Sequence, residues 1–173
     1  MTTFSIVEDA SVGASGVSAG VIASVKANIL AAAELWNRYF VQGAFDIKIE
    51  LIFDDISGST LATGGSGLTF SGFGGAGFEV WKVDSIEEYI IGGEFALDDG
   101  DPGTDDTIDI SITVDTPLLL AGDFFFDPDP FSRTAAVPAG KNDFMSVMLH
   151  EMGHGFGFLS VSFKFRRNGY GGR

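Results

Sequence analysis

Hydrophobic residues recur with two different periods along the chain, and each period predicts a different element. In residues 17–41 they are spaced three and four apart, which is typical of one face of a long helix. The residues on this face are Val21, Val25, Ile29, Ala32, Trp36 and Phe40. Residues 45–53 and 108–114 alternate between apolar and polar, which is typical of half-buried strands. With an apolar run at residues 4–7, the pattern predicts strand, helix, strand and strand.

Weaker patterns complete the order of elements. Residues 8–16 are rich in Ser, Gly and Ala and predict a loop, while residues 78–83 predict a further strand. A capping-box pattern predicts a short helix at residues 85–91, and the aromatic residues 123–131 predict a strand followed by a loop. Asn142 or Asp143 would cap a final helix that lies within residues 143–158. The predicted fold class is α+β, a twisted mixed sheet with helices packed on one face.

Residues 58–77 are dense in glycine, and two interpretations apply to them. The segment could form a flexible rim beside a substrate, or it could be a connector that contains a short strand at residues 68–70. Glycine permits many turns and specifies none, so the connector is favoured. The segment carries no phosphate-loop pattern, because no Lys follows its glycines at the required spacing.

Composition narrows the classes of function. The chain has 173 residues, 45% of them hydrophobic, which predicts one globular domain. A net charge of −14 disfavours nucleic acids and anionic membrane surfaces as partners, because their phosphates would repel the protein. There is no cysteine, and no segment resembles a membrane span or a cleavable signal peptide. A secreted, extracellular setting of the bacterial type is the expectation, and the oligomeric state is left open.

Acidic residues concentrate in residues 97–109, which include six aspartates. Clustered carboxylates suit a hard cation, so Ca²⁺ is one candidate ligand for this segment. The spacing lacks the glutamate that closes an EF-hand loop, so a solvated acidic loop is the favoured interpretation.

The chemistry concentrates in His150-Glu151-Met152-Gly153-His154, which fits the pattern H-E-x-x-H. On a helix, two histidines four residues apart project from one face and can supply two ligands of a tetrahedral Zn²⁺ site. Glu151 follows the first ligand, so it can reach a water activated by the metal and act as general base. The alternative is an amphipathic core helix with incidental histidines. Both histidines of the chain lie in this motif, which favours the metal site.

The segment 138–144 followed by 149–158 resembles the active-site region of zincin metallopeptidases of the metzincin or matrixin-like type. The order of one long helix, a sheet and then this helix is similar to the N-terminal subdomain of that family. The resemblance implies that His150 and His154 bind zinc, and that Glu151 activates the water and later protonates the leaving amine. It also implies that Gly157 marks where the helix ends and the chain turns.

The segment after His154 departs from the family pattern. The extended pattern would put the third zinc ligand at position 160, where this chain has Ser160, and no His, Asp or Glu follows His154. The methionine turn is missing as well, because no Met follows Met152. We therefore divide the chain into a zincin-like catalytic part, residues 1–159, and an atypical basic tail, residues 160–173. Three explanations stay open: a truncated or frame-shifted end, an upstream carboxylate as third ligand, or a degenerate and inactive relative.

Two functions follow from these observations. The first is a zinc-dependent endopeptidase whose extended polypeptide substrate adds a strand to an edge of the sheet, for which residues 108–114 are the expected edge. The second is a non-catalytic, acidic secreted module that keeps the zincin fold and binds Ca²⁺. A chance H-E-x-x-H in an intracellular protein is the third and least favoured interpretation.

Overall fold

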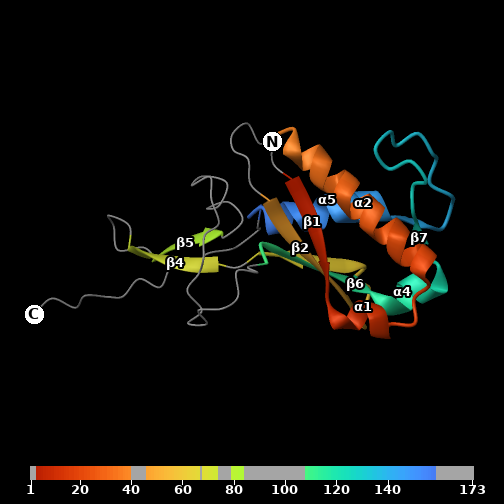
Figure 1. Cartoon of the computed structure of the whole chain (residues 1–173), viewed down its shortest axis with the longest axis horizontal. Coiled ribbons are helices and arrows are strands. Elements are labelled where there is room, and N and C mark those ends of the chain that lie inside the picture. The colour runs from red at the N-terminus through yellow and green to blue at the C-terminus, as the bar shows by residue number, and fades with distance from the viewer. Residues whose placement is uncertain (1–2, 40–45, 67, 74–78, 84–107, 159–173) are drawn as a thin grey trace, which may run out of the picture.

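The computed structural model describes residues 3–39, 46–66, 68–73, 79–83 and 108–158, and every structural statement below concerns these residues. Four strands form one mixed sheet in the order β1-β2-β6-β3 (Figure 1). Strands β1 (Thr3–Glu8), β2 (Asp46–Asp54) and β6 (Ile110–Asp115) are parallel to one another. Strand β3 (Ala62–Gly65) pairs antiparallel with β6 and forms one edge of the sheet, opposite β1. The α+β prediction is confirmed at this level.

Two helices pack side by side on this sheet. Helix α2 (Ala19–Asn37) contacts β1 and helix α5 (Phe144–Gly155), and α5 in turn contacts β3 and β6. The layer between the sheet and the two helices is apolar. The alternating positions of β2, such as Ile49 and Leu51, face the apolar sides of both helices there. Val25 and Ile29 of α2 are fully buried in this layer. The predicted long helix and the two alternating strands are confirmed.

Helix α2 is apolar enough and long enough to cross a membrane by length and composition alone. Its packing gives it a different role, since Val25, Ile29 and Ala32 are buried in the protein core. Its exposed Lys26 forms an ion pair with Glu8 of β1 at 2.6 Å. A side with buried aliphatic residues and a side with a charged residue are typical of a core helix in a globular protein.

Two short helices occupy segments where the hydrophobic pattern predicted none. Helix α1 (Ala10–Ala14) lies within the predicted loop, and it forms because the Asp9 carboxylate accepts a hydrogen bond from the Ser11 N–H. Helix α4 (Thr116–Ala121) follows β6 directly, with Asp115 as its N-cap. Pro117 fits the first turn of this helix, where no N–H is needed.

The expected edge strand was wrong. Strand β6 lies inside the sheet between β2 and β3, and its Ile110, Ile112 and Val114 are fully buried. The edge strand next to α5 is β3, which lies within the glycine-dense segment for which a connector is the favoured interpretation. Small residues hid this strand from the sequence pattern, because a run of Ala, Thr and Gly has no alternation of apolar and polar side chains.

Several other predicted segments can be compared with the structure. Strand β4 (Leu68–Phe73) pairs antiparallel with β5 (Glu79–Val83) in a separate two-stranded sheet, so both predicted strands exist. The aromatic segment contributes β7 (Phe124–Phe125), which pairs with β8 (Asn142–Asp143). The predicted helix at 85–91, the acidic residues 97–107, Ser160 and the basic tail lie outside the described residues.

The interpretation of residues 97–109 as a solvated acidic loop is wrong for Asp109. This residue is buried, with 3% of its surface exposed, and its carboxylate accepts a hydrogen bond from the Lys48 N–H at 2.7 Å. The Asp109 N–H also donates to the Lys48 carbonyl at 3.1 Å. Asp109 therefore joins the sheet, where its side chain extends the pairing between β2 and β6 by one residue.

Candidate metal centre

Helix α5 presents the H-E-x-x-H motif because its other face is held by the core. Phe144, Met145, Met148 and Met152 are fully buried, and their spacing of three to four residues marks the face that packs inward. The helix begins after Asp143, one of the two predicted caps. The Asp143 carboxylate makes no capping hydrogen bond and instead contacts Arg133, at 2.7 Å, and the Ser146 hydroxyl. His150 lies on the exposed side of the helix.

The two imidazoles converge at their Nε2 atoms. The distance between the Nε2 atoms of His150 and His154 is 3.0 Å, and the ring planes are inclined by 84°. Two nitrogens bound to one tetrahedral Zn²⁺ at ordinary bond lengths lie about 3.3 Å apart. A shift of a few tenths of an ångström would thus seat one ion between them, so these two residues fit zinc as two of its ligands.

A backbone carbonyl orients one of the rings. The Nδ1 atom of His154 lies 3.0 Å from the carbonyl oxygen of Phe158. A proton on Nδ1 that is donated to this oxygen leaves the lone pair of Nε2 free for a metal. The backbone turn at Gly157, with φ of +81°, folds the chain back so that Phe158 reaches the helix end. The predicted turn at Gly157 is therefore confirmed, and it positions the carbonyl group that orients the His154 ring.

Glu151 sits at the inner side of this motif. It is buried, with 8% of its surface exposed. Burial raises the pKa of its carboxyl above 4.5, while the charges of His150 and His154 and a hydrogen bond from the backbone of Gly64 lower it in part. A carboxyl whose pKa is raised toward neutral pH is better matched to accept a proton from water.

A groove runs between α5 and the edge of the sheet beside these residues. Its volume is about 390 Å³. The residues that line it are Thr60, Leu61, Ala62, Ser146, Val147, His150 and Glu151. One wall thus comes from the start of β3 and the other from two turns of α5. A ligand in this groove would contact the edge strand and the H-E-x-x-H motif at the same time.

The described residues offer two candidate zinc ligands and no third. No group of three or more His, Cys, Asp or Glu side chains gathers at a common point within the described part of the chain. Position 160, where the family pattern expects the third ligand, lies outside it, as does the acidic segment upstream of β6. The described residues therefore bring His150, Glu151 and His154 together, and no third metal-ligating side chain joins them among these residues.

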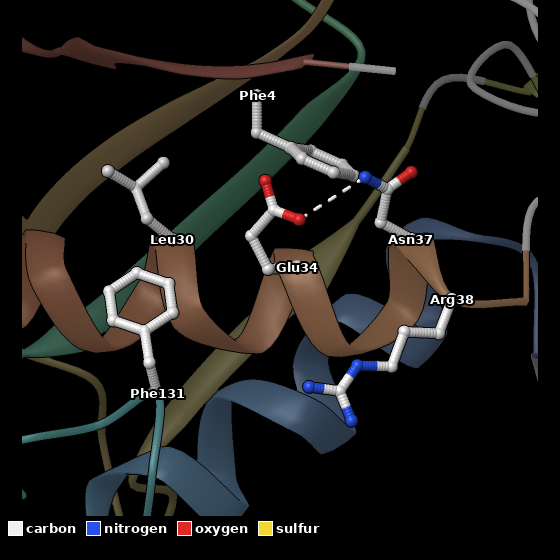
Figure 2. A pocket seen from close by; sticks show the side chains of 6 residues that line it. All are labelled: Phe4, Leu30, Glu34, Asn37, Arg38 and Phe131. Atoms are coloured by element: carbon white, nitrogen blue, oxygen red, sulfur yellow. Dashed lines mark hydrogen bonds between the residues drawn. The ribbon is translucent and has the colours of Figure 1, made fainter. Parts of the chain in front are cut away.

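A second hollow lies at the opposite edge of the sheet and has a different character (Figure 2). It measures about 620 Å³ and is lined by Phe4, Leu30, Glu34, Asn37, Arg38 and Phe131. The Asn37 amide donates to the Glu34 carboxylate at 3.2 Å, so these two polar groups contact each other. It contains no histidine and a single carboxylate, a set that does not suit a metal centre.

Sequence reasoning missed the groups that support the motif. Gly64 lies directly against Glu151, and the carbonyl of Phe158 orients His154. A glycine-dense segment gives no signal for which of its glycines meets a helix, and backbone carbonyls give no sequence signal at all. Phe158 offered one indirect clue, since an apolar residue just past the helix end often packs back on it. Here its ring stacks on Trp36, with 5.3 Å between the centroids.

Three comparisons with known proteins found no match for this chain. The chain matches no protein-family model, no curated protein and no solved structure.

Proposed function

We propose that this protein is a zinc-dependent endopeptidase with the architecture of the zincin N-terminal subdomain. One observation carries the proposal: the His150 and His154 Nε2 atoms converge 3.0 Å apart, beside a buried Glu151, in a groove along the edge strand. The long helix α2, the mixed sheet with an antiparallel edge strand, and α5 beneath that strand support the same conclusion.

The residues divide the chemistry between them. His150 and His154 would hold the metal, with Phe158 orienting the second imidazole. Zinc, when bound, supplies Lewis-acid polarisation of the scissile carbonyl and lowers the pKa of the attacking water. Glu151 takes the proton from that water and delivers it to the leaving amine. Its burial raises its pKa and so makes it a stronger base than an exposed glutamate.

The edge strand offers the backbone groups that would bind a polypeptide. The Asp115 N–H donates to the Leu61 carbonyl, so residues 61, 63 and 65 turn their hydrogen-bonding groups toward β6. Ala62 and Gly64 consequently turn theirs toward the free edge. An extended substrate that pairs with these groups would lie along the groove, with its backbone close to His150 and Glu151.

Replacement of the general base tests this proposal. Glu151→Gln keeps the shape of the side chain and removes its ability to accept a proton. We expect hydrolysis of an unstructured protein such as casein to fall at least about 100-fold, with zinc content unchanged. Glu34→Gln, on the far side of α2, is the matched control and should retain activity. Retained proteolysis in Glu151→Gln would contradict the assignment.

A second candidate is a non-catalytic acidic module that keeps this fold and binds calcium. The absence of a third ligand among the described residues favours it. The two candidates differ in the metal that stabilises the protein. Zinc bound through His154, and lost in His154→Ala, supports the peptidase. A melting temperature that rises with calcium, with no zinc bound, supports the module.

A further inference from the structure

Strand β3 touches helix α5 at a point where only glycine fits. A Cβ placed on Gly64 would lie 2.3 Å from the carbonyl oxygen of Glu151 and 2.7 Å from both its carbonyl carbon and its Cβ. Distances under 3.0 Å are essentially never seen for real Cβ atoms. At the next residue, Gly65, an added Cβ would meet nothing within 4 Å. The strand backbone therefore lies directly on the helix backbone at position 64.

This contact sits at the residue that carries the proposed general base. The blocking atoms belong to the backbone and Cβ of Glu151, so no rotation of the glutamate side chain could make room. The N–H of Gly64 points toward the free edge of the sheet, because the pairing with β6 uses the backbone groups of the residues on either side of it. The glycine thus limits both the spacing between strand and helix and the place of the carboxylate.

We propose that Gly64 is a positioning residue for Glu151: by having no side chain, it lets the edge strand rest on α5 and holds the carboxylate at the wall of the groove. The proposal rests on the proposed peptidase function for its catalytic consequence. A larger residue at position 64 would push strand and helix apart, because its Cβ would lie 2.3 Å from the Glu151 carbonyl oxygen, closer than the 3.0 Å that real Cβ atoms keep. The ligands His150 and His154 would stay together on α5, while Glu151 would lose its place relative to a substrate on β3.

The comparison of Gly64→Ala with Gly65→Ala tests this inference in the full chain loaded with zinc. Gly64→Ala should lower kcat about 100-fold, because small misplacements of a catalytic group cost that much. Its zinc content should equal that of the unmodified protein, and its KM should change less than about threefold. Gly65→Ala should keep kcat. Equal kcat in the two variants, or full kcat in Gly64→Ala, would overturn the proposal.

A spectroscopic measurement decides the question without any activity, and also if Gly64→Ala fails to fold. In ¹H–¹⁵N spectra, Glu151→Gln should shift the Gly64 amide resonance more than that of Gly65, because the carboxylate charge beside Gly64 is removed. A Gly64 resonance that does not move would overturn the positioning role. If the unmodified chain hydrolyses no peptide while the Gly64 resonance does move, the proposed function fails and the positioning of Glu151 stands.

Discussion

At the scale of single residues, glycines set how closely α5 approaches the sheet. Gly64 meets the backbone of Glu151, and Gly155 at the end of the helix meets Ile110 of β6. A Cβ on Gly155 would lie 2.7 Å from one methyl group of Ile110 and 3.0 Å from two further carbons. Ile110 is fully buried, so its side chain has little freedom to give way.

This packing predicts opposite effects for two Gly→Ala changes. Gly155→Ala should lower the free energy of unfolding by about 1–3 kcal/mol, because the methyl group overfills the core against Ile110. Gly20→Ala, in α2 with open space around it, should raise the free energy of unfolding by about 0.5 kcal/mol, because alanine favours the helix. Urea denaturation of both variants measures the difference. A Gly155→Ala protein as stable as the unmodified one would contradict the close approach of α5 to β6.

The raised pKa of Glu151 should make the free energy of unfolding depend on pH. Its pKa is raised in the folded protein, so the folded state binds the proton more tightly than the unfolded state. The free energy of unfolding therefore falls as the pH rises from 4.5 through the raised value of the folded state. Glu151→Gln removes this loss, so it should stabilise the protein more at about pH 7 than at about pH 4. Urea denaturation at both values, with a chelator present, measures it; an equal effect at both would argue against a raised pKa.

At the scale of elements, one tryptophan ties the two long helices together. The indole N–H of Trp36 in α2 donates to the Leu149 carbonyl of α5 at 3.1 Å. Its ring also lies 5.7 Å from the ring of Phe156 and stacks on Phe158. The same residue that binds the middle of α5 thus holds the turn that brings the Phe158 carbonyl to His154. The orientation of the second histidine therefore depends on how α2 is placed.

The N-cap residue of α2, Ser18, should contribute measurably to the stability of the protein. The Ser18 hydroxyl accepts a hydrogen bond from the Val21 N–H at 3.4 Å, and Ser18→Ala should lower the free energy of unfolding by about 1 kcal/mol. Ser24 is the matched control on the same helix, since its hydroxyl donates only to the Gly20 carbonyl. Ser24→Ala should be neutral or slightly stabilising. Equal thermal stability of the two variants would contradict the role of Ser18 as a cap.

The elements that the sequence predicted correctly are those with strong periodicity. Helix α2 and strands β2 and β6 each bury one face, so core packing imposes their spacing on the sequence. Strand β3 escaped detection because it packs at Gly64 against the helix backbone of Glu151, a contact that favours small residues and gives no alternation of apolar and polar side chains. Helix α1 escaped because its single turn depends on the local cap at Asp9.

The candidate site also has a part that the sequence predicts and a part that it does not. The residues that we propose for the chemistry, His150, Glu151 and His154, were evident from their spacing, because a helix with 3.6 residues per turn fixes where their side chains project. The contributions of Gly64 and Phe158 are made by backbone atoms. Such contributions depend on how distant segments meet, so the fold was needed to find them.

At the scale of the whole molecule, the fold brings an edge strand and a histidine helix to one side of the sheet. Helix α5 lies under β3, and the groove between them opens beside both imidazoles. The opposite edge, formed by β1, carries no comparable set of ligands among the residues described there. The proposed chemistry therefore lies at one edge of the sheet, and it requires that this edge binds zinc.

Elemental analysis of the purified full chain shows whether zinc is bound there. We expect one zinc ion per chain, lost in His154→Ala and retained in Glu151→Gln, because the first change removes a proposed ligand and the second removes only the proposed general base. Chains that contain no zinc after equilibration with the ion, or zinc that survives the loss of His154, would contradict a metal centre at this motif.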